Sequence, residues 1–339
     1  MLPDSASPVE EKDIPFPSNK KESGEEEPMT FDQLVQQFKS LRDKKQLGKI
    51  EIASVAKKEL QKIINNSGLL DTYDIRFLIQ EEQVNSKEKY KFRYEITRST
   101  LDNIYNSFQN NITASKQILL VVNSLGGDME SAYFISKCCK KYSKDNKFLA
   151  CIPRRAKSAA TLISLGACEI HMGDISELGP IDPQIGHLPV LALGEAVKYI
   201  SKIVEEMPGS SEMFAKFLSY QLNLQVLGYM NRVAETAVDY AVRLLNGKEL
   251  QKSSKEIARD LVNKYKDHGF VIDKDEAKQL LGANFIKIDT KEYHLANKIY
   301  LYLEDVKLAL YAVDGKFYFT DFIGTTDNLW LNMSVQDDE

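Results

Sequence analysis

Two clusters of small residues in this chain have the residue types that oxyanion chemistry needs. Gly126-Gly127 lies between an expected strand and an expected helix, where inward-turned backbone N–H groups can stabilise a developing negative charge. Ser158 opens a second expected helix, and its hydroxyl would be a nucleophile at the positive end of the helix dipole. A tight turn explains the two glycines equally well, and an N-cap role explains the serine. The residue types alone leave both interpretations open.

The glycine turn does not match a nucleotide-binding motif. A dinucleotide fingerprint needs a third glycine, but Ser131 and Ala132 follow, and a phosphate loop needs a Gly-Lys-Ser/Thr sequence that is absent here. The cysteines lack the paired spacing of a zinc site, and they stand at Cys138, Cys139, Cys151 and Cys168. We therefore expect reduced thiols, no metal and no cofactor.

The elements that must position these residues alternate between strand and helix. Apolar runs at 118–122 and 148–152, followed by 169–172, predict parallel strands that are buried on both faces. Helices are expected between them at 129–142 and 158–167. Each glycine-bearing turn then follows the C-terminal end of a strand, which is where open α/β sheets place their sites.

Composition changes divide the chain into five segments. We expect a disordered acidic and polar tail at 1–28, an N-terminal helical segment at 29–70, an α/β catalytic core at 71–190, a helical extension with a completing α/β segment at 191–290, and a C-terminal hairpin and tail at 291–339. The hairpin is expected across 307–322, because Asp314-Gly315 is a two-residue turn signal between alternating residues.

The overall charge and hydropathy exclude several protein classes. The net charge is −5 with acids and bases interspersed, so we expect no nucleic-acid partner. The longest apolar run is too short to span a bilayer, and the first residues do not resemble a secretory signal. A cytoplasmic protein without a membrane-spanning segment is the expectation.

Three motifs together resemble the serine dehydrogenase proteinase family, which is related to signal peptide peptidase A and, more distantly, to the Clp protease proteolytic subunit. They are NSLGG at 123–127, RAKSAAT at 155–161 and ELGPIDPQ at 177–184. The first motif departs from the usual Ser-Pro-Gly-Gly because Leu125 replaces the proline, while both glycines are kept. With the patterns above, the resemblance predicts an α/β fold, a Clp/crotonase-type spiral of βαβ units with a helical extension and a C-terminal β-hairpin.

The resemblance also implies roles for individual residues. It makes Ser158 the nucleophile, and it places the oxyanion hole at the backbone N–H groups of Gly126, Gly127 and Ala159. It implies a wall beside the substrate, and subunit contacts, at Gly179, Pro180 and Asp182. The activity expected is that of an ATP-independent serine peptidase or amidohydrolase, which acts on polypeptide as a homo-oligomer.

The general base is the unsettled part of this site. Pro183 occupies the position at which Clp subunits carry their histidine. Signal peptide peptidases use a lysine further on, at a distance that fits Lys198, but this residue lies on the polar face of its helix. His268 falls within one position of the aspartate of Clp subunits, and we prefer it as the base. The less suitable candidates are His171 in a strand, His187 in a loop, and Lys157, which is expected to point away from its neighbour Ser158.

Two other functions remain open at this point. A crotonase-type acyl-CoA enzyme would use the same N–H donors to stabilise a thioester enolate, but no basic cluster indicates a coenzyme A pocket. A catalytically inactive scaffold of the same fold would explain the missing standard base.

Overall fold

The computed structural model describes residues 26–80, 82–83, 92–93, 95–109, 115–185, 188–265, 267–315, 318–325 and 329–335. Nearly all of the tail predicted at 1–28 falls outside these residues, as does His187.

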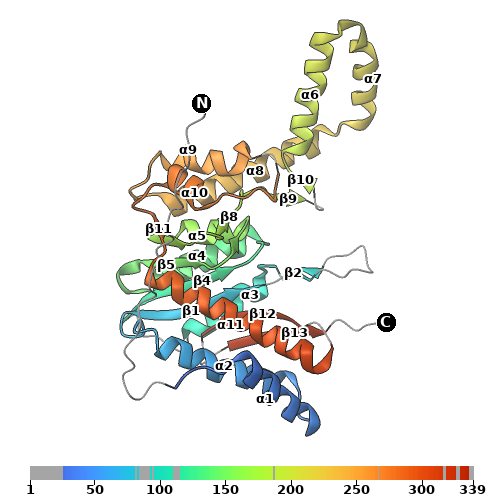
Figure 1. Cartoon of the computed structure of the whole chain (residues 1–339). Helices are drawn as coiled ribbons and strands as arrows, with labels where there is room; N and C mark the ends of the chain where they lie inside the picture. Colours follow the sequence, from blue (N-terminus) through green and yellow to red (C-terminus); the bar gives the residue numbers. More distant parts are fainter. Residues whose placement is uncertain are drawn as a thin grey trace, which may run out of the picture.

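A seven-stranded sheet in the order β11-β7-β5-β4-β1-β12-β13 forms the centre of the molecule (Figure 1). Its strands are β1 (Tyr73–Ile79), β4 (Gln117–Asn123), β5 (Phe148–Ile152), β7 (Glu169–Met172), β11 (Ile286–Ile288), β12 (Tyr318–Gly324) and β13 (Leu329–Val335). The pairs from β1 to β11 are parallel, whereas β12 is antiparallel to both β1 and β13. The predicted α/β class with a mainly parallel sheet is confirmed.

Strand β4 shows why the central strands are continuous apolar runs. Ile118, Leu120 and Val122 pack into one hydrophobic cluster. Leu119 and Val121, which point to the opposite face, pack into a second cluster. Because both faces of the sheet are buried, every position from 118 to 122 is apolar rather than every second one.

Helices cover both faces of the sheet (Figure 1). On one face lie α3 (Arg98–Gln109), α4 (Met129–Tyr142) and α5 (Ala159–Leu165), with α8 (Leu224–Leu245), α9 (Ser254–Arg259) and α10 (Lys274–Leu281) packed beyond them. On the other face lie α1 (Phe31–Asp43), α2 (Lys49–Asn65) and α11 (Lys291–Asp314). No helix in the described part of the chain has the length and apolar character to cross a membrane.

A small second layer of backbone pairing crosses the C-terminal ends of the central strands. Strand β6 (Arg155–Ala156) is parallel to β8 (Glu177–Leu178). Single bridges join Ser124 to Ala156 and Leu178 to Ile272. The other short strands are β2 (Glu82–Gln83), β3 (Phe92–Arg93), β9 (Gln184–Ile185) and β10 (Leu188–Pro189). The β6–β8 layer brings three chain segments together beside Ser158.

A helical arm projects from the body of the molecule (Figure 1). It contains α6 (Ala192–Glu206), a 3-10 turn (Pro208–Ser210), α7 (Ser211–Gln221) and the first half of α8. We define the arm as residues 192–232, because none of these residues is buried and the buried part of α8 begins at Ala234.

The hairpin predicted at Asp314-Gly315 is wrong. Helix α11 continues to Asp314, and Gly315 adopts a left-handed φ of 70° and donates its N–H to Tyr311 O at 2.8 Å. An Asp-Gly pair suits a helix C-cap as well as a hairpin turn, because both need a residue with positive φ. The antiparallel pair in this region is β12 with β13, which begins after the predicted turn.

The end of the helical extension agrees with its sequence pattern. Asp273 caps α10 by accepting hydrogen bonds from Asp275 N and Glu276 N, and the helix ends at Gly282.

All four cysteines are unpaired thiols, as their spacing predicted.

Candidate active site

Ser158 occupies a strained backbone position between β6 and α5. Its φ is 52° and its ψ is −117°, a combination that residues with a side chain rarely adopt. Its side chain makes no capping hydrogen bond to α5, so the N-cap explanation does not account for this residue. Such strain persists only where the surrounding structure enforces it, and it is concentrated at functional sites.

A pocket of about 440 Å³ opens beside Ser158. It collects residues from six separate parts of the sequence. They are Glu95, Leu125, Gly126, Gly127, Asp128, Met129, Ser158, Ala159, Ile181, Asp182, Pro183, Gln184, Val233 and His268. The pocket thus brings the glycine turn, the serine and His268 together.

The glycine turn fits where no residue with a side chain could. Gly126 and Gly127 have φ values of 110° and 142°. A Cβ on Gly126 would lie 2.8 Å from Ser158 Cβ, and a Cβ on Gly127 would lie 2.4 Å from Ile96 O. Ile96 holds this turn from outside, because it donates to Gly126 O at 2.8 Å and accepts from Asp128 N at 2.7 Å.

Two backbone N–H groups beside Ser158 have no acceptor among the residues that the structure describes. The N–H of Gly126 donates to Ser124 Oγ at 3.2 Å, so it is already used inside the turn. Within the described chain, neither Gly127 N–H nor Ala159 N–H donates to a protein acceptor. Of the three predicted oxyanion-hole residues, Gly127 and Ala159 therefore have N–H groups available for a ligand.

His268 and Asp182 face each other at the pocket. His268 Nδ1 lies 3.5 Å from Asp182 Oδ2, and the side chains are 24% and 12% exposed. Nδ1 is buried and has no hydrogen-bond partner among the described residues, so Asp182 is its nearest anionic group. A carboxylate in this position can orient an imidazole and stabilise its protonated form.

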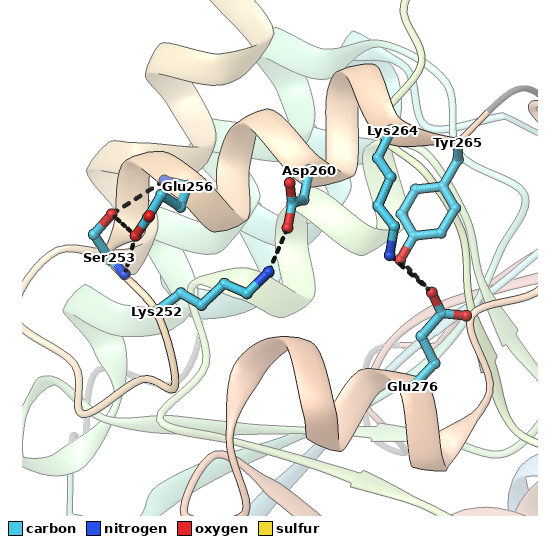
Figure 2. A network of polar contacts seen from close by, with 7 residues as sticks. All are labelled: Lys252, Ser253, Glu256, Asp260, Lys264, Tyr265 and Glu276. Carbon is cyan, nitrogen blue, oxygen red and sulfur yellow. Dashed lines mark hydrogen bonds and ion pairs between the residues drawn. The ribbon is translucent and has the colours of Figure 1, made fainter.

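The loop that carries His268 is held at both ends by contacts of Tyr265. Tyr265 follows a π-helical turn (Asp260–Lys264). Its hydroxyl donates a hydrogen bond to Glu276 Oε1 at 2.8 Å, and its ring packs on that of Phe270 with 4.8 Å between the ring centroids. Figure 2 shows the contact of Tyr265 with Glu276 among the polar contacts of Lys252, Ser253, Glu256, Asp260, Lys264, Tyr265 and Glu276. The loop between the π-helical turn and α10 is therefore tied to both.

The other predicted site residues lie elsewhere. Lys198 is 76% exposed on α6, forms an ion pair with Glu195 at 2.8 Å and does not line the pocket. His171 is buried in β7 at 2.6 Å from Thr290 Oγ1, and burial lowers its pKa. Gly179 and Pro180 belong to the segment that leads to Asp182, but they do not line the pocket.

The pairing of Asp182 with His268 was missed from the sequence, although a signal for it exists. Pro183 stands where Clp subunits carry histidine, and its neighbour Asp182 is an acid. His268 stands beside the position where those subunits carry the acid. Taken together, the two departures place an aspartate and a histidine in each other's positions, on two chain segments that meet in space.

The segment that contains this site matches a known protein family. A model of the ClpP-like SDH-type serine proteinase family matches residues 90–311, which include the glycine turn, Ser158, Asp182 and His268. The uncharacterized protein MJ0137 of Methanocaldococcus jannaschii is 27% identical over 165 residues, 49% of this chain and 52% of that protein. The uncharacterized protein MJ1495 of the same organism is 25% identical over 186 residues, 55% of each chain.

The chain spans about half the length of the curated relatives it matches. The family match is longer, and it covers well over half of the chain and the whole of the candidate site. The chain therefore belongs to the ClpP-like SDH-type serine proteinase family.

Proposed function

We propose that this protein is a serine peptidase that cleaves polypeptides with Ser158 as nucleophile, His268 as general base and Asp182 as the group that orients His268. The observation that carries the proposal is the strained Ser158, whose side chain caps nothing and which shares one pocket with His268 and Asp182. Membership in a serine proteinase family supports the same reaction class.

Each group has a defined part in this reaction. The Ser158 Oγ attacks the carbonyl carbon of the substrate, and His268 Nε2 takes the hydroxyl proton. Asp182 stabilises the imidazolium through Nδ1, and the N–H groups of Gly127 and Ala159 donate to the oxyanion. His268 then returns the proton to the leaving amine, and a water molecule hydrolyses the acyl ester by the same steps.

We also propose that the enzyme works as a homo-oligomer. The arm exposes large apolar side chains that nothing in the described chain covers, including Tyr199, Met213, Phe217 and Tyr220. The arm begins and ends near the pocket: Val190, just before it, donates its N–H at 2.9 Å to the carbonyl of the pocket residue Pro183, and Val233, which follows it, lines the pocket. An assembly that covers the arms would therefore also shape access to Ser158.

A fluorophosphonate probe tests the proposed nucleophile directly. The probe should modify Ser158 covalently, and the modification should be absent in Ser158→Ala. An acyl-CoA enzyme of the same fold, or an inactive scaffold, would not be labelled. Peptide mapping that finds no adduct on Ser158 would refute the proposed function.

A further inference from the structure

Lys157, the residue before Ser158, is a buried charge with an unusual set of partners. Its side chain is 10% exposed, and its Nζ donates to Gly269 O at 2.8 Å. The same Nζ forms an ion pair with Glu177 Oε1 at 3.1 Å. Burying an ammonium group is costly unless it is paired and hydrogen-bonded, and here both conditions are met.

The Lys157 side chain reaches this position through a gap that Gly179 leaves. A Cβ on Gly179 would lie 2.8 Å from Lys157 Cγ and 2.9 Å from its Cβ. The backbones of the two segments are also joined, because Gly179 N donates to Ala156 O at 3.0 Å. This explains a glycine at position 179 without requiring that residue to touch substrate.

Lys157 consequently contacts each chain segment that bears a proposed catalytic group. Its backbone belongs to the turn that carries Ser158, and its stem packs on the segment that leads to Asp182. Its ammonium holds the carbonyl of Gly269, the residue next to His268. Residues 157 and 269 are 112 positions apart, so this hydrogen bond is a long-range tie.

The contacts of Lys157 argue against two simpler roles. A solvated surface lysine would not be buried against Gly179 and ion-paired to Glu177. A lysine base would need its Nζ in the pocket, and Lys157 does not line the pocket.

We propose that Lys157 is a positioning residue, which fixes the loop that carries His268 against the turn that carries Ser158. This inference rests on the proposed function. Removal of the tie should leave substrate binding intact and misalign the proton transfer, because His268 would be free to shift relative to Ser158.

The test replaces Lys157 by Met, which keeps the apolar stem, and by Arg, which keeps a donor. In Lys157→Met, kcat on a short peptide should fall roughly tenfold to a hundredfold with little change in KM, as small misplacements of catalytic groups do. The dependence of kcat on pH should also change, because His268 acquires a different environment. Lys157→Arg should recover part of the lost activity.

Lys248→Met is the matched control. Lys248 is also a poorly exposed lysine that donates to backbone carbonyls, those of Leu165 and Ala167, but it does not line the pocket. The Lys248→Met substitution should change the thermal unfolding of the protein without changing the dependence of kcat on pH. If Lys157→Met unfolds at the assay temperature, the comparison is made at a lower temperature at which both variants are folded.

Two results separate a failure of this inference from a failure of the proposed function. If the wild type is labelled at Ser158 and Lys157→Met is labelled at the same rate with the same pH profile, the positioning role is wrong. If the wild type is not labelled, NMR of the His268 imidazole decides. An unchanged resonance in Lys157→Met overturns the inference, and a shifted resonance with unchanged His171 and His294 signals supports it.

Discussion

Helices α5 and α7 show two opposite uses of a short helix in one chain. All seven residues of α5 are buried, and Lys248 donates hydrogen bonds to the carbonyls of Leu165, its last residue, and of Ala167, just after the helix. No residue of α7 is buried, and even its large apolar side chains Phe217 and Tyr220 are 56% and 87% exposed.

The two helices differ in how much of their apolar surface this chain itself covers. Helix α5 has small residues where it must pack closely, and every apolar side chain on it has a partner within the same chain. Helix α7 presents large apolar side chains that cost free energy in water, which supports the proposal that a second copy of the chain covers them. We expect substitutions at α5 to act on the reaction and substitutions at α7 to act on assembly.

The strongest test of this distinction compares one serine from each helix region. Ser158→Ala should reduce hydrolysis of an unfolded protein by roughly 10⁴-fold or more, because the nucleophile is lost while the pocket remains. Ser219→Ala on α7 should hydrolyse at the wild-type rate. Steady-state turnover measures both variants, and normal turnover by Ser158→Ala would remove the nucleophile from the site.

The candidate bases allow a second comparison of the same kind. His268→Ala should lower kcat by about 10³-fold or more, and Lys198→Ala on the arm should have no such effect. Wild-type activity should fall at acid pH because a protonated imidazole cannot accept the proton of Ser158. Rates across pH 5 to 10 give the measurement. A profile that rises only at alkaline pH and collapses in Lys198→Ala would favour the lysine.

Replacing a glycine by alanine should change the stability of the protein in opposite directions at the candidate site and in the arm. Gly127→Ala should lower kcat by about 10²-fold or more and reduce stability, because the new Cβ meets backbone atoms of Ile96 and blocks an oxyanion donor. Gly228→Ala, in the exposed first half of α8, has open space and should stabilise the protein by up to about 1 kcal/mol. Chemical denaturation with parallel rate measurements tests the pair, and a harmless Gly127→Ala would rule out the oxyanion role.

Substitutions of apolar residues in the arm should weaken the proposed assembly. Replacing Phe217 and Tyr220 by Ser should raise the dissociation constant of the oligomer about tenfold or more, since apolar aromatic side chains dominate such interfaces. Lys216→Ala, on the same helix, is the control. Sedimentation equilibrium provides the measurement. A wild-type protein that is monomeric at micromolar concentration would contradict the interpretation of the arm.

The last prediction is a pH dependence of stability near the C-terminal end of α5. Burial lowers the pKa of Lys248 to about 7. An unfolded lysine titrates near ~10.4, so between these values the unfolded state binds more protons and the free energy of unfolding rises with pH. Lys248 should contribute at most about 1.4 kcal/mol per pH unit to the slope of the unfolding free energy against pH. This contribution should be lost in Lys248→Met. Urea unfolding from pH 7 to 10 tests this, with the exposed Lys216→Met as a variant whose slope stays unchanged.

The central strands were predictable because their signal is local. Continuous apolar runs such as 118–122 can only be strands buried on both faces or helix cores, and their length decides for strands. The turn at Asp314-Gly315 was not predictable in the same way. Both a hairpin and a helix C-cap require a glycine with positive φ, and only the packing of α11 against α1 and α2 distinguishes them.

The candidate site was predictable in part. The motifs that resemble a known family identified Ser158 and the glycines, but no sequence pattern reports the φ of 52° at Ser158. The contact between Asp182 and His268, like that between Lys157 and Gly269, joins residues far apart in the chain. Such contacts depend on how the loops cross, which neither propensity nor periodicity encodes.

The distance along the chain between Lys157 and Gly269 has a consequence for the time during which the protein is made. A ribosome adds residues at roughly 5 to 20 per second, so the 112 residues between them take on the order of 5 to 20 s. Throughout this interval the growing chain carries its proposed nucleophile but neither the base nor the loop that would align it. The order in which the residues are synthesised therefore keeps the proposed hydrolytic site incomplete in the nascent chain until His268 and its loop have been made.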